Sequence, residues 1–144
     1  YTSNDQKNFL NPAGMYGWTW EEASAKYHIS YMLANNAPGS KHATVERFRE
    51  AGIAAGYTFR VSDCRTNGLE TRLVVSNQGI APIYRDAYVE VDGVKGEYSL
   101  KNLMPGEEVW IHFKGSGISA QSVPEIVCGH LVPGQKIEYD ADVR

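Results

Sequence analysis

The sequence has little of what marks nucleic-acid-binding or membrane-spanning proteins. Lys and Arg are scattered singly along its 144 residues, and the formal net charge is −3. Because nucleic-acid-binding domains usually carry a basic patch or stripe, we expect no nucleic-acid partner. No apolar run approaches the roughly 20 residues that a membrane-spanning helix needs, so we expect no membrane partner either.

A secretion signal is also missing, and the chain begins abruptly at Tyr1. We interpret this start as that of a domain trimmed from a longer protein, so the missing signal does not bear on location. The length suits one domain with a short N-terminal extension. Such a chain buries about two thirds of its unfolded surface and needs no disulfide to form a core.

Cysteine is scarce, since Cys64 and Cys128 are the two in the chain. They are consistent with one disulfide in an oxidising compartment or with two buried thiols, and the sequence leaves both alternatives open. No Cys-x-x-Cys spacing accompanies them, and the four histidines lie too far apart to suggest a ligand set. We therefore expect no metal site among these residues and no cofactor. The sequence leaves open whether Asp63, Asp86 and Asp92 help to hold a calcium ion in a loop or only satisfy backbone donors in turns.

The first 56 residues have a helical or mixed pattern. Thr19 followed three residues later by Glu22 is typical of a capping box at a helix start. A second helix is indicated by apolar residues at helical spacing, beginning with Val45, and Gly56 is a suitable stop after it. The elements predicted here are a helix over residues 20–27, a strand over 28–33 and a helix over 44–55.

From Tyr57 onward the apolar pattern changes to alternation with a period of two, which indicates strands. Asp92-Gly93 is a strong signal for a tight hairpin turn. Short strands with turn signals about every ten residues predict an antiparallel, immunoglobulin-like β-sandwich over residues 57–144, with residues 1–56 packed on it as an extension. The predicted strands cover residues 57–62, 69–76, 87–91, 94–100, 109–113, 123–128 and 136–143.

Tyr16, Trp18 and Trp20 form a first group of candidate ligand-binding residues. Sugar rings present flat C–H faces that pack against aromatic rings, so exposed Trp and Tyr side chains suit carbohydrate binding. Trp18 and Trp20 share a face only if this segment is extended. The alternative is that these rings anchor an N-terminal helix to the sandwich.

Trp110 is the second candidate. Alternation along its strand directs Val109, Ile111 and Phe113 inward and leaves Trp110 and His112 pointing outward. A large apolar ring on the outer face of a sheet needs a reason, and ligand binding is one. Tyr88 is placed in the same way on another strand.

We predict that Tyr88, Trp110 and His112 line one binding face if the two strands are neighbours. The alternative is that the N-terminal helices cover this face.

Three carboxylate pairs raise the possibility of acid–base catalysis. Glycoside hydrolysis needs two carboxylates several ångströms apart across a bond. Adjacent residues of a strand point to opposite faces, however, and solvated acidic surface accounts for such pairs without chemistry. We therefore expect no catalytic residues among these pairs, which are Glu21-Glu22, Glu107-Glu108 and Asp140/Asp142.

Two segments carry a family resemblance. Residues 51–61 have the sequence AGIAAGYTFRV, and residues 75–84 have the sequence VSNQGIAPIY. They resemble a bacterial family of uncharacterised domains with a GYRF strand followed by an N-x-G-x-A-P-(L/I)-Y corner. Members of that family follow a (β/α)-barrel and close the chains of secreted proteins that resemble glycoside hydrolases. Residues 131–137 are similar to closing strands of such sandwiches.

The resemblance implies a β-sandwich in a carbohydrate-related, extracellular context, and it supplies no catalytic residues. It also implies that residues 1–56 are the tail of a preceding barrel or a cap adapted to the sandwich. We expect a secreted or cell-surface carbohydrate-binding module, with polysaccharide and the parent enzyme's catalytic domain as partners. The alternatives are a structural accessory domain without its own ligand and an enzyme that uses a carboxylate pair.

Overall fold

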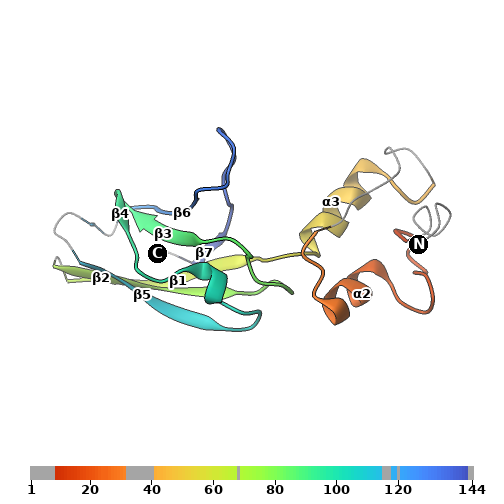
Figure 1. The fold of residues 1–144 in the computed structure, drawn as a ribbon, viewed down its shortest axis with the longest axis horizontal. Coiled ribbons are helices and arrows are strands. Elements are labelled where there is room, and N and C mark those ends of the chain that lie inside the picture. The colour runs from red at the N-terminus through yellow and green to blue at the C-terminus, as the bar shows by residue number, and fades with distance from the viewer. Residues whose placement is uncertain (1–8, 32–40, 68, 115–117, 120, 143–144) are drawn as a thin grey trace. The chain divides into compact units, whose positions relative to one another are not determined.

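The computed structural model describes residues 9–31, 41–67, 69–114, 118–119 and 121–142 of the chain. The chain divides into two compact units, the first ending at Gly56 and the second beginning at Tyr57. This boundary coincides with the change from a helical to an alternating sequence pattern. The first unit contains helices α2 and α3, and the second contains all the described strands (Figure 1).

Helix α2 (Trp20–Tyr27) begins at the predicted capping box. The Thr19 hydroxyl accepts a hydrogen bond from the Glu22 backbone N–H at 3.2 Å, and the Glu22 carboxylate accepts one from the Thr19 N–H at 2.8 Å. Two N–H groups that lack helical partners are thereby satisfied. The helix ends at His28, whose left-handed backbone has φ 51°. The predicted helix over residues 20–27 is confirmed.

Helix α3 (Val45–Ile53) confirms the second predicted helix, with ends one and two residues inside those expected. The Thr44 hydroxyl caps it by accepting a hydrogen bond from the Arg47 N–H at 3.1 Å. Val45 was expected on the apolar face, but 63% of it is exposed. It lies in the first turn, outside the stretch that packs around buried Ala51.

The strand predicted over residues 28–33 is wrong for residues 28–31, while residues 32–33 lie outside the described part. Ile29 donates its N–H to the Ser24 carbonyl at the end of α2, and its own carbonyl accepts from the Gly56 N–H. These backbone groups are therefore not free to form a ladder. A Cβ on Gly56 would lie 2.9 Å from the Ser30 carbonyl oxygen, so this close approach requires glycine.

A small core holds the first unit together around Trp20, which is 5% exposed. Its indole N–H donates to the Ala51 carbonyl at 2.8 Å, and Phe9 meets its ring edge-on at a centroid distance of 5.0 Å. Leu10 and Ala43 complete the buried set. The Trp20 ring thus joins α2 to α3 by packing and by a buried hydrogen bond.

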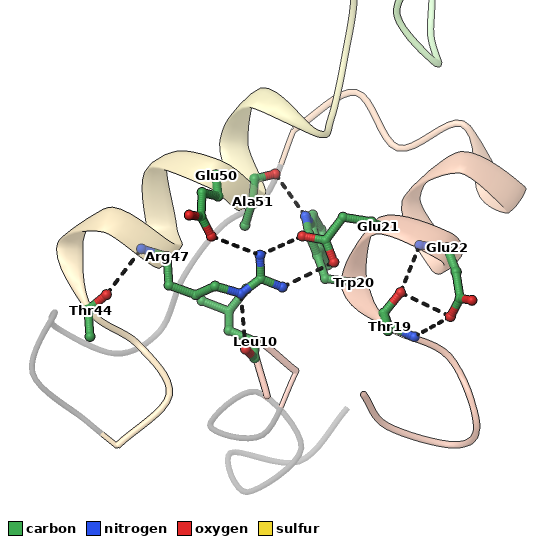
Figure 2. A network of polar contacts seen from close by, with 9 residues as sticks. All are labelled: Leu10, Thr19, Trp20, Glu21, Glu22, Thr44, Arg47, Glu50 and Ala51. Atoms are coloured by element: carbon green, nitrogen blue, oxygen red, sulfur yellow. Dashed lines mark hydrogen bonds and ion pairs between the residues drawn. The ribbon is translucent and has the colours of Figure 1, made fainter. Parts of the chain in front are cut away.

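An ion pair adds a second connection between the two helices (Figure 2). Arg47 of α3 binds both carboxylate oxygens of Glu21 of α2, at 2.5 and 3.1 Å. The Arg47 Nε donates to the Leu10 carbonyl at 3.1 Å, and the Arg47 Nη1 lies 3.6 Å from Oε2 of Glu50. The Arg47 side chain is 18% exposed, so these contacts satisfy a largely buried guanidinium.

The second unit is mainly β, as predicted, and its strands form two sheets. The four-stranded sheet has the order β5-β2-β1-β7, and the three-stranded sheet has the order β4-β3-β6. A short 3₁₀ helix, η1 (Leu100–Asn102), connects them. The bounds are β1 Phe59–Thr66, β2 Glu70–Asn77, β3 Ala87–Val91, β4 Val94–Lys95, β5 Glu108–Lys114, β6 Pro124–Cys128 and β7 Asp140–Asp142.

Most pairings are antiparallel, but β7 runs parallel to β1. The expectation of a purely antiparallel arrangement is therefore wrong at this edge. The strand predicted over residues 94–100 ends early, at Lys95, and the one predicted over residues 136–143 begins late, at Asp140, while residue 143 lies outside the described part. After β4 the Gly96 N–H still bonds to the Val89 carbonyl, and the chain then turns into η1. The Asp92-Gly93 hairpin turn is confirmed, with φ values of 49° and 78°.

Buried residues from both sheets belong to one hydrophobic core. A Cβ added to Gly96, beside β4, would lie 2.5 Å from Cγ2 of Ile111 on β5. The chain after β4 therefore touches the inner face of the opposite sheet. The core residues alternate along the strands as the sequence predicted, and they include Phe59, Val61, Leu73, Val75, Ala87, Val89, Val91, Ile111, Phe113 and Ile126.

The corner after β2 is organised by the buried side chain of Asn77, which has no exposed surface. Its amide nitrogen donates to the carbonyls of Ala81 and Leu103, at 3.0 and 3.1 Å. Its amide oxygen accepts from the backbone N–H groups of Thr58 and Gly79, at 3.3 and 3.0 Å. One side chain thus ties four backbone positions together at the N-x-G-x-A-P corner.

The two cysteines are free thiols. Cys64 lies on β1 and Cys128 on β6, and each is half-buried against the shared core. Burial raises the pKa of the Cys64 thiol, which lowers its reactivity. The structure therefore corresponds to the alternative without a disulfide, with thiols that are half-buried and not fully buried.

Candidate functional site

The outward side of the four-stranded sheet carries the candidate site, which we call the outer face. It is formed by Arg65 on β1, Arg72 on β2, and Trp110 and His112 on β5. The sheet register places Arg65 opposite Arg72, and Arg72 opposite His112. Three nitrogen-bearing side chains thus form a row across three strands. Trp110 stands in the next row along β5, opposite Val74.

A β-bulge in β1 brings Arg65 to the outer face. Asp63 and Cys64 together occupy the space opposite one residue, Leu73, so the register shifts between Ser62 and Arg65. Asp63 takes a left-handed backbone with φ 49°. Simple alternation from Val61 would direct Asp63 and Arg65 toward the core. The extra residue reverses the inward–outward alternation of side chains along β1, so Cys64 packs on the core and Arg65 points outward.

Asp63 also fixes the orientation of Arg65. The Arg65 Nε and Nη2 atoms donate to the two Asp63 carboxylate oxygens, each at 2.7 Å. These hydrogen bonds hold the pKa of Asp63 below its ordinary value, and the charges of Arg65 and Arg72 act in the same direction. Arg72 has no ion-pair partner within 4 Å among the described residues.

Trp110 is 40% exposed, as the alternation of β5 predicted. The guanidinium carbons of Arg72 and Arg65 lie 5.0 and 5.7 Å from its ring centroid. Both distances are within the range in which a cation is attracted to an aromatic face. The ring is therefore bordered by two cations and still offers surface to a ligand.

A hollow of about 330 Å³ lies on the same face, and Arg65 and Arg72, which border the Trp110 ring, are among its lining residues. Its lining is polar, and it offers guanidinium, imidazole, amide, hydroxyl and carboxylate groups to a ligand. A polar hollow near an exposed aromatic ring suits a ligand with one apolar face and many hydroxyl groups. The residues that line it are Arg65, Thr66, Asn67, Glu70, Arg72 and His112.

Tyr88 does not belong to this face. It lies on β3, in the three-stranded sheet, whereas Trp110 and His112 lie on β5 in the four-stranded sheet. The core lies between these sheets, and Tyr88 points away from it, so the single face predicted for Tyr88 and Trp110 is wrong. Tyr88 is half-buried beneath Lys95, whose Nζ is 4.5 Å from the ring centroid. It borders a separate hollow of about 430 Å³.

The three N-terminal aromatic residues differ in exposure. Trp20 is buried between α2 and α3, so it serves the core and a ligand has no access to its ring. Trp18 is 41% exposed, with the Lys26 Nζ 4.0 Å from its ring centroid, and Tyr16 is 75% exposed. Trp18 and Tyr16 belong to the first unit, so they form a candidate separate from the outer face.

Two of the carboxylate pairs have structural partners. Glu21 binds Arg47, and Glu22 completes the capping box of α2. Glu107 accepts a hydrogen bond from the Met104 N–H at 3.0 Å, while its neighbour Glu108 is exposed on β5. These partners give Glu21, Glu22 and Glu107 a structural role. Asp140 is exposed at the start of β7, and the side chain of Asp142 lies outside the described part.

The sequence pattern did not indicate Arg65 and Arg72 as site residues. The outward position of Arg72 follows from alternation with Leu73 and Val75, so the signal was present. The position of Arg65 depends on the bulge at Asp63, which period-two reasoning does not predict. Within the described ranges, no group of three or more metal-ligating side chains comes together. No helix there is long and apolar enough to cross a bilayer.

Comparison of the chain with protein-family models, with curated proteins and with solved structures found no match.

Proposed function

We propose that this chain is a non-catalytic polysaccharide-binding module of a secreted glycan-degrading system, with an immunoglobulin-like sandwich as its scaffold. The observation that carries the proposal is the exposed Trp110 ring on the outer face, bordered by two arginines that also line a polar hollow. Burial of an aromatic ring against a sugar face supplies apolar contact. The surrounding Arg and His side chains supply hydrogen-bonding groups for sugar hydroxyls.

The rigidity of the outer face supports this proposal. Trp110 lies within a seven-residue strand that is paired with β2 along its length. Arg65 is held by two hydrogen bonds that it donates to the Asp63 carboxylate. A ligand that meets an ordered surface loses less affinity to the cost of ordering the protein. An exposed sheet face also suits a polymer chain better than an enclosed pocket does.

A structural accessory role without a ligand is the second candidate, favoured by exposed apolar residues on α3. Val45 and Ile53 are eight residues apart, and they are 63% and 67% exposed. Such residues suit a helix that packs against another domain of the parent protein. This role and glycan binding differ in what they require of Trp110, since the accessory role assigns no function to its exposed surface.

Affinity electrophoresis against soluble polysaccharides, with pull-downs on insoluble ones, tests the proposal. We expect retention on at least one polymer, and Trp110→Ala should weaken it by about tenfold or more because a Trp anchor typically contributes about 2 kcal/mol. Trp18→Ala is the matched control, since its ring is equally exposed and also lies beside a cation. Circular dichroism should show both variants folded.

Retention on no polymer of the panel would remove glycan binding and leave the accessory role in its place. Loss of binding by Trp18→Ala with no effect of Trp110→Ala would place the site in the first unit.

A further inference from the structure

We propose that the outer face selects polysaccharides whose sugar rings carry acidic groups. Arg72 binds the acidic group, while the sugar ring that carries it packs against Trp110. This inference rests on the proposed function and adds the class of glycan to it. It is carried by the row of Arg65, Arg72 and His112 that adjoins the aromatic ring.

The two arginines play different parts. The Asp63 carboxylate engages Nε and Nη2 of Arg65, which neutralises its charge locally and leaves it as a positioned neighbour. Arg72 has no such partner among the described side chains. A guanidinium offers five N–H donors in a planar fork that matches a carboxylate, so Arg72 has free capacity for an anion.

The remaining charges of the outer face favour an anion at this end of it. Lys114 stands opposite Glu70 in the register, so the Glu70 carboxylate in the hollow has a cationic neighbour across the strands. Glu108 lies two residues before Trp110, on the side away from the arginine row. A bound polysaccharide would therefore place its acidic groups over Arg72 and its uncharged parts toward Ser76 and Glu108.

The position of Arg72 against Trp110 affects acidic and neutral glycans differently. Its guanidinium carbon lies 5.0 Å from the ring centroid, so it covers part of the surface on which a neutral sugar would pack. An acidic glycan gains an ion pair with this group, whereas a neutral glycan must displace it. The same side chain thus favours one class of polymer and disfavours the other.

The experiment measures affinity for a polyuronate, a sulfated polysaccharide, a neutral glucan and polyglutamate, on the intact chain at two salt concentrations. We expect the acidic polysaccharides to bind best and to bind more weakly at high salt. The polyuronate and sulfated arms distinguish carboxylate from sulfate as the anion. Polyglutamate binding of equal strength would overturn the inference, because it would show attraction to any polyanion.

Arg72→Ala should weaken binding to the acidic polymer about tenfold, since hydrogen bonds to charged groups contribute more than neutral ones. It should leave binding to a neutral glucan unchanged or stronger. The affinity of Arg72→Lys for the acidic polymer should lie between those of the unmodified chain and Arg72→Ala, because lysine keeps the charge and lacks the planar fork. Arg85→Ala is the control, since Arg85 is exposed in the loop before β3 and outside the outer face.

Asp63→Asn supplies a test in the opposite direction. Asparagine tolerates the left-handed backbone at this position, and the change frees Arg65 from its carboxylate partner. Affinity for the acidic polymer should therefore rise, and a rise is not produced by misfolding.

Equal losses on acidic and neutral polymers in Arg72→Ala, or tighter binding of the neutral glucan by the unmodified chain, would overturn the acidic-glycan inference and leave glycan binding standing. Binding to no polysaccharide would overturn both.

Discussion

Asn77 is a polar residue at full burial, and every hydrogen-bonding atom of its side-chain amide is used. It lies where β2 ends and the chain turns toward the second sheet. The backbone adds to the same junction, since the Asn77 N–H donates to the Glu107 carbonyl and the Gly106 N–H donates to the Asn77 carbonyl. The N-x-G-x-A-P corner noticed in the sequence therefore has a physical role in the fold.

Asn77→Ala should lower the free energy of unfolding by about 3 kcal/mol, because it leaves several buried backbone groups without partners at about 1–3 kcal/mol each. Urea unfolding of the two proteins measures the difference. Gln78→Ala is the control, since Gln78 is the exposed neighbour and should change stability little. A loss below about 1 kcal/mol for Asn77→Ala would show that the corner does not depend on this side chain.

At the same scale, the sequence predicted the outward direction of Trp110 and His112 because one strand's alternation determines it. It did not predict whether Trp20 is exposed. That residue follows a capping box, and its burial depends on Phe9 and Ala51, which lie far from it in the chain. Contacts between segments distant in sequence cannot be derived from local spacing.

At the scale of elements, helices α2 and α3 are joined by the Arg47–Glu21 ion pair as well as by packing around Trp20. The hydrogen bonds from Arg47 are the main cause that lowers the pKa of Glu21 below its ordinary value of 4.5. A carboxyl group with a lowered pKa in the folded state contributes stability above its unfolded pKa. This contribution is lost as the pH falls through the folded pKa.

We therefore expect the first unit to lose stability as the pH falls below about 4.5, and Glu21→Gln to be less sensitive to this change. The effect should be under about 1 kcal/mol because the carboxylate is partly exposed and screened by solvent. Urea unfolding at pH 7 and pH 3 measures it in both proteins. An equal loss of stability in the variant would assign the acid sensitivity to other carboxyl groups of the first unit, such as Glu22.

Elements with local signals were predicted well, and those that depend on distant partners were not. The capping residues Thr19 and Thr44 mark the start of both helices, and Asp92-Gly93 marks its hairpin. By contrast, the segment after α2 has strand-like residues but uses its backbone to meet Gly56. The parallel pairing of β7 with β1 joins residues about 80 positions apart in the chain, and no short-range pattern encodes it.

At the scale of the whole molecule, the division at Gly56 separates the helical core from the sheets that carry the outer face. Each unit has its own cluster of buried side chains. The sequence indicated this division because its hydrophobic period changes there. It could not indicate which strands belong to which sheet, and for that reason Tyr88 was grouped with Trp110.

Trp20→Ala tests whether the two units are independent in function. Removing this ring should destabilise the first unit by about 3–5 kcal/mol, as is usual when a large core aromatic is truncated. Hydrogen exchange should quicken in residues 9–56, and affinity for the polysaccharide should stay within about twofold. A matching loss of affinity would show that the first unit forms part of the binding site.

The place of β5 at the end of the strand order β5-β2-β1-β7 has a consequence for solubility. Among the described strands its backbone has a neighbour on one side, so its other side offers hydrogen-bonding groups to a strand from another molecule. Residues 109–113 are rich in aromatic and β-branched side chains, a composition that promotes fibril formation when exposed. His112 within this run, and Glu108 and Lys114 at its ends, interrupt it with polar groups that resist dehydration. The polar side chains beside Trp110 therefore also help to keep the protein dispersed in solution.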